Sequence, residues 1–101
     1  MNRQQRSRLN ELREKYAPPS RSDTEYQVFG TGSQGEVIFA GVYHARRMSV
    51  RMARRIANKW RRWRQTLIAD PRYDVFAVER VRFLWMYPSG GDPKQGKCFR
   101  V

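Results

Sequence analysis

Apolar residues recur at spacings of three and four through the middle of the chain, and this pattern predicts one long α-helix over residues 45–69. That stretch contains neither glycine nor proline, and Asp70-Pro71 would end the helix. One side of the helix would carry an apolar stripe that packs against the rest of the fold. The stripe consists of Ala45, Met48, Met52, Ile56, Trp60, Trp63 and Leu67.

Segments rich in β-branched and aromatic residues predict strands on both sides of this helix. The first two would pair as a β-hairpin across the glycine-rich residues 30–35. In the third, which is long, Glu79-Arg80 would mark a bend or bulge. The strand segments are 25–29, 36–43, 74–87 and, as either an edge strand or a loose tail, 97–101.

The N-terminal residues 1–16 contain good helix formers but few apolar positions, so we expect a weakly attached basic helix or arm. Two prolines would end it, residues 17–24 would be a linker, and residues 25–101 would form a single domain. The predicted fold class is α+β, with a small antiparallel sheet of three or four strands packed on one long amphipathic helix, in the order α-β-β-α-β. The apolar positions of the N-terminal helix are Leu9, Leu12 and Tyr16.

Residues 28–37, VFGTGSQGEV, contain the spacing G-x-G-x-x-G-x-V that occurs in nucleotide-binding loops. A dinucleotide site needs a helix after the glycines, whereas a strand is predicted here. A kinase loop does lie between two strands, but a kinase also needs a strand lysine and the H-R-D and D-F-G motifs, which the chain lacks. We therefore expect Gly30–Gly35 to be a hairpin tip in which glycine supplies a positive φ, with contact to a partner's backbone as a second interpretation.

Charge is strongly unbalanced: 21 Lys and Arg residues stand against 9 Asp and Glu residues, and the net charge is +12. The basic residues concentrate in residues 46–64, and no acidic residue occurs between Glu36 and Asp70. With a helical period of about 3.6 residues, most of these side chains point away from the apolar stripe. The candidate binding residues are Arg47, Arg51, Arg54, Arg55, Lys59, Arg61 and Arg62.

An arginine-rich face without carboxylates favours contact with phosphates, because a guanidinium group can bind a phosphate through two hydrogen bonds. We therefore expect a small basic nucleic-acid-binding accessory protein, for DNA or RNA, of the kind that phages and mobile elements encode. The alternative is a protein-binding effector or inhibitor that docks the same face on an acidic partner, such as a nuclease, a polymerase or a defence nucleoprotein complex. A solvated face without a partner also stays open, and membrane binding ranks below these because the core needs the apolar stripe.

Little in the sequence indicates catalysis, so we expect neither an enzyme nor a cofactor. His44 is the lone histidine and is expected to be structural, and one cysteine, Cys98, provides neither an internal disulfide nor a metal cluster. No signal peptide or membrane span is expected, and the predicted location is cytoplasmic. Phe39 and Tyr43 could stack nucleic-acid bases from a sheet face, but packing in the core is favoured. Pairing of edge strands would permit a homodimer.

Overall fold

The computed structural model describes residues 2–16, 25–45, 47–62, 75–89 and 95–101. Its strands form one antiparallel sheet in the order β2-β1-β3-β4. The predicted α+β class is confirmed, and the C-terminal segment forms the fourth strand. The elements are α1 (Arg3–Tyr16), β1 (Glu25–Thr31), β2 (Val37–His44), α2 (Val50–Arg62), the 3-10 helix η2 (Val75–Arg80), β3 (Phe83–Pro88) and β4 (Lys97–Arg100).

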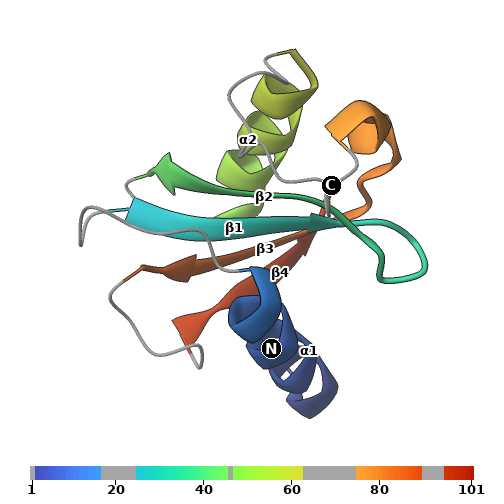
Figure 1. Ribbon diagram of the computed structural model, residues 1–101. Coiled ribbons are helices and arrows are strands. Elements are labelled where there is room, and N and C mark those ends of the chain that lie inside the picture. Colours follow the sequence, from blue (N-terminus) through green and yellow to red (C-terminus); the bar gives the residue numbers. More distant parts are fainter. Residues whose placement is uncertain (1, 17–24, 46, 63–74, 90–94) are drawn as a thin grey trace.

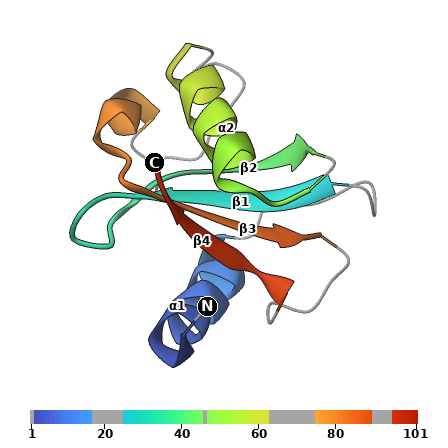
Figure 2. The same ribbon diagram turned by 180° about the vertical axis from the view of Figure 1, so that it is seen from behind.

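Helices cover both faces of the sheet. Figures 1 and 2 show α2 and η2 on one face and α1 on the opposite face. Each face has its own core, because successive side chains of a strand point to opposite sides of the sheet. The core under α2 includes Val28, Phe39, Leu84, Met86, Ile56 and Trp60, and the core under α1 includes Phe29, Trp85, Tyr87, Leu9 and Leu12.

β1 and β2 form the predicted hairpin, with an irregularity in the pairing near its tip. Gly30 pairs with Phe39, whereas the next residue of β1 pairs with Val37. Ile38 is therefore an extra residue in β2, a β-bulge. Ile38 and Phe39 both pack in the core under α2, while Val37 packs with the core under α1. Simple alternation would place Val37 and Phe39 on one face, and the bulge separates them.

α1 packs on the sheet through two of its few apolar positions. Leu9 and Leu12 are fully buried, and they lie among the aromatic side chains of Phe29, Trp85 and Tyr87. At about 1.5–3 kcal/mol for each buried leucine, burial of the pair stabilises the attachment by about 3–6 kcal/mol. The expected helix is therefore present, and its partner is the second face of the sheet, which the helical segment alone does not reveal. The strength of its attachment stays a prediction.

A side-chain cap fixes the start of each α-helix. In α1, Oδ1 of Asn2 accepts a hydrogen bond from the backbone N–H of Gln5 at 2.8 Å, and Oε1 of Gln5 accepts one from the backbone N–H of Asn2 at 3.0 Å. In α2, Oγ of Ser49 accepts a hydrogen bond from the backbone N–H of Met52 at 3.1 Å. Each cap satisfies a backbone donor that has no partner inside the helix.

The predicted start of the long helix is wrong, because the helix is capped at Ser49. The helix begins at Val50 and not at residue 45. Ala45 and Met48 pack against the core, as the apolar stripe predicted, but they do so from the segment before the helix. The last part of the predicted helix, residues 63–69, lies outside the described residues.

The predicted strand over residues 74–87 is correct only in its second half. Residues Val75–Arg80 form η2, and β3 begins at Phe83. Val78 and Val81 are both fully buried in the core under α2. Valine has a high strand propensity, yet here burial of residues three apart favours a tight helical turn over a strand.

Candidate nucleic-acid interface

The apolar side of α2 is held against the sheet by small and large residues in turn. Its buried residues are Ala53, Ile56, Ala57 and Trp60. The Trp60 ring packs edge-on against Phe39, with the ring centroids 3.7 Å apart and the planes at 88°. The absence of a side chain at Gly41 makes room for Trp60, since a Cβ at that position would lie 2.8 Å from its Cζ2 atom. This packing fixes which side of α2 faces outward.

The outward side of α2 carries most of its basic residues. At about 100° per residue, Arg51, Arg55 and Arg62 lie within about 30° of the direction opposite the buried stripe. Arg54 and Arg61 lie about 70–90° to one side of that direction, and Lys59 lies about 70° to the other side. Apart from Arg61, which is partly buried, all are exposed.

We refer to the seven predicted binding residues together as the cationic face. Six belong to α2 itself, and Arg47 is exposed in the segment that precedes it. Two open hollows are lined by all of these residues except Arg61, and both include Arg51 and Arg55. The helical period accounts for the six residues on α2, whereas Arg47 joins them from the segment before the helix. The structure thus brings together Arg47, Arg51, Arg54, Arg55, Lys59, Arg61 and Arg62.

No carboxylate of the described residues forms an ion pair with the cationic face. The cationic face makes few polar and ring contacts with the described residues. Nη1 of Arg61 donates a hydrogen bond to Oδ1 of Asn58 at 2.9 Å, and the Lys59 ammonium lies 4.9 Å from the centroid of the Tyr43 ring. Neither contact neutralises charge, so the positive potential of the face is not offset within this part of the protein.

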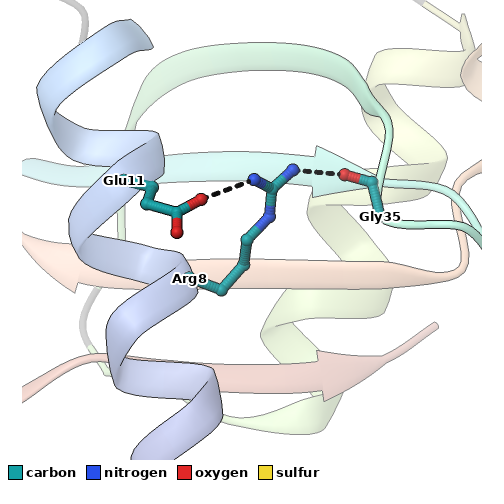
Figure 3. A network of polar contacts seen from close by, with 3 residues as sticks. All are labelled: Arg8, Glu11 and Gly35. Carbon is teal, nitrogen blue, oxygen red and sulfur yellow. Dashed lines mark hydrogen bonds and ion pairs between the residues drawn. The ribbon is translucent and has the colours of Figure 1, made fainter.

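The basic residues of α1 are arranged differently, as Arg8 illustrates. Nη1 of Arg8 lies 3.0 Å from Oε2 of Glu11, and Nη2 donates a hydrogen bond of 2.6 Å to the backbone carbonyl of Gly35 (Figure 3). Arg8 therefore ties α1 to the glycine-rich loop. Helical spacing also places Arg3 and Glu14, which are about three turns apart, on the same outward side of α1, so this helix presents mixed charge and not a second cationic face.

Each glycine of the G-x-G-x-x-G spacing meets a local structural need. A Cβ at Gly30 would collide with the Phe39 ring, and one at Gly32 would collide with the Glu36 carboxylate. Gly35 has a φ of +79°, a conformation that glycine adopts readily. The Glu36 carboxylate also accepts a hydrogen bond of 3.0 Å from the backbone N–H of Gln34. A backbone N–H of the loop therefore binds the exposed carboxylate of Glu36, whereas a nucleotide-binding loop would use such groups to hold a phosphate.

The remaining candidates have structural surroundings. Phe39 is fully buried. His44 is at the exposed end of β2, with Nε2 3.3 Å from Oε1 of Glu25. Burial raises the pKa of the Cys98 thiol to about 11, which keeps it in the unreactive neutral form at neutral pH.

A search of the described residues finds no group of three or more His, Cys, Asp or Glu side chains placed to hold a metal ion. Nor does that part of the chain contain a helix with the length and apolar character needed to cross a membrane.

Comparisons of the chain with protein-family models, with curated proteins and with solved structures found no match.

Proposed function

We propose that the protein binds nucleic acid through the phosphate backbone, using the cationic face of α2. The observation that carries this proposal is the separation of the two sides of α2, one buried in the core and the other exposed, basic and without a carboxylate partner among the described residues. Phosphates are the ligands that guanidinium groups bind best, and each neutralised phosphate releases condensed counterions.

The arrangement of charge along α2 supports a polyanionic partner. Arg51 and Arg55, and then Arg55 and Lys59, are like charges four residues apart, and such pairs destabilise a helix by about 0.2–0.5 kcal/mol each. The first turn of α2 contains no acidic residue, although acidic side chains there would favour the helix dipole. Bound phosphates would remove the repulsion between these like charges, whereas a face that only contacts water would keep it.

A charge-reversal experiment tests the proposal. Replacing Arg51, Arg54 and Arg62 by Glu lowers the net charge from +12 to +6, because each replacement changes the charge by two. The matched control also carries three Arg-to-Glu replacements, and it therefore has the same net charge as the α2 variant. They lie at Arg3, Arg6 and Arg100, which are exposed residues of α1 and β4. Circular dichroism would establish that both variants are folded.

Binding would be measured by fluorescence anisotropy with a labelled duplex and a labelled single strand, in 50 and 200 mM salt. We expect the α2 variant to lose affinity by about 100-fold or more, and the control to lose less than about tenfold, because phosphate contacts are local. Equal losses in the two variants would contradict the proposal. So would an unmodified protein that fails to bind either nucleic acid in 50 mM salt, a result that would favour an acidic protein as the partner.

A further inference from the structure

The cationic face has two flanks as well as an outward ridge, and this shape suits some nucleic acids better than others. The ridge contains Arg51, Arg55 and Arg62, with Arg54 on one flank and Lys59 on the other. A single phosphate chain could follow the ridge or one flank, but it could not contact both flanks of a helix together. A double-stranded groove, in contrast, has a phosphate wall on each side.

The dimensions of α2 agree with a groove of this kind. An α-helix with its side chains is about 10–12 Å across, and the major groove of B-form DNA is about 12 Å wide. From Arg51 to Arg62 the ridge extends about 16 Å at 1.5 Å per residue. In A-form RNA the major groove is deep and narrow, and side chains cannot read it. The width of the helix therefore favours DNA over RNA duplexes.

Among the described residues, the aromatic rings near the cationic face are not free to stack on single-stranded bases. Phe39 is fully buried, and only 4% of Trp60 is exposed. The Lys59 side chain extends over the ring of Tyr43, which is partly buried. Proteins that bind single strands without sequence preference usually combine a basic groove with exposed aromatic faces. Next to α2, the described residues provide a basic surface but no exposed aromatic ring.

We propose that α2 enters the major groove of B-form DNA, with its ridge toward the base edges and one flank toward each phosphate strand. This inference rests on the proposed function and narrows it to one class of nucleic acid. In this position Arg51, Arg55 and Arg62 reach the groove floor, where guanine offers two acceptors that match a guanidinium group. Arg54 and Lys59 reach phosphates of opposite strands.

The test compares one sequence of about 20 base pairs as a DNA duplex, an RNA duplex and the separate DNA strands. We expect the DNA duplex to bind at least about tenfold more tightly than the other forms. A second DNA duplex would carry bulky groups on carbon 5 of its pyrimidines, which project into the major groove. We expect these groups to weaken binding by about tenfold or more. The single variants Arg54→Gln and Lys59→Gln, one for each flank, should both weaken duplex binding.

The outcomes separate this inference from the proposed function. If the single strands or the RNA duplex bind as tightly as the DNA duplex, or if the groove-filling groups have no effect, the inference is overturned. Loss of affinity in only one of the two flank variants would also overturn it. In all three cases the charge-reversal result at α2 would still support phosphate binding. If the unmodified protein binds none of the nucleic acids, the proposed function itself is lost.

Discussion

Neutralising three arginines of the cationic face should change how steeply DNA binding depends on salt. Arg61 is hydrogen-bonded to Asn58, so we count the other six residues of the cationic face as phosphate contacts. Each contact contributes about −0.9 to the slope of log K against log salt, and six contacts give a slope of about −5.4. Changing Arg51, Arg54 and Arg62 to Ala then leaves about three contacts and a slope of about −2.7. In the major-groove arrangement, by contrast, only Arg54 of these three contacts a phosphate, and the slope would become less steep by only about 0.9.

These slopes predict clearly different losses between 50 and 200 mM salt. Over that fourfold range the unmodified protein should lose about 2,000-fold in affinity, and the triple alanine variant about 40-fold. Anisotropy titrations at five or six salt concentrations would give both slopes, and a variant with Ala at Arg3, Arg6 and Arg100 is the matched control. If the α2 variant and the unmodified protein had the same slope of log K against log salt, these arginines would not contact phosphates, and the reasoning would be refuted.

Four further predictions concern stability, measured by urea denaturation. Gly41→Ala should destabilise the protein by about 1–3 kcal/mol, because its Cβ would displace the Trp60 ring; a change below about 0.5 kcal/mol would show that Trp60 can move at no cost. Leu12→Ala should cost about 2–5 kcal/mol, because Leu12 is fully buried under α1, and an unchanged midpoint would mean that α1 does not hold the fold together. Burial raises the pKa of Tyr87 to about 12 from 10.0, so the stability that neutral Tyr87 provides should be present below pH 10 and be lost as the pH rises from 10 toward 12. Tyr87→Phe should make that loss less steep, and an identical alkaline profile would contradict this assignment. The triple alanine variant of α2 should be as stable as the unmodified protein or slightly more stable, since it removes like-charge repulsion; a loss above about 1 kcal/mol would indicate a structural role for these arginines.

The cationic face was predictable from sequence because two simple patterns coincide there. The period of about 3.6 residues separates the apolar stripe from the arginines, and the run without acidic residues is visible without a structure. The start of the helix was predicted wrongly because Ala45 and Met48 continue the apolar spacing although they precede the helix. Ser49 was the available signal, since serine is a favoured N-cap residue.

Other features depended on partners that are distant in sequence. Residues 75–80 include valines, which favour strands, yet they form a 3-10 helix. In that helix Val78 packs in the core under α2. The bulge at Ile38 could not be predicted from alternation, because it changes which face each residue occupies. The contact between Arg8 and Gly35 joins residues that are 27 positions apart, and no local pattern in α1 indicates it.

α1 and α2 pack on opposite faces of the sheet, and their outward sides differ in charge. α1 contributes buried leucines on one face of the sheet, while its outward side carries mixed charge. α2 is held on the other face by Ile56 and Trp60, and burial of those two side chains, at about 1.5–3 kcal/mol each, exceeds the repulsion among its arginines. Because packing holds α2, its outward side need not contribute to folding. The fold does not require this concentration of cations, which forms no ion pair with a carboxylate of the described residues, and the proposed binding of an anionic ligand would give it a role.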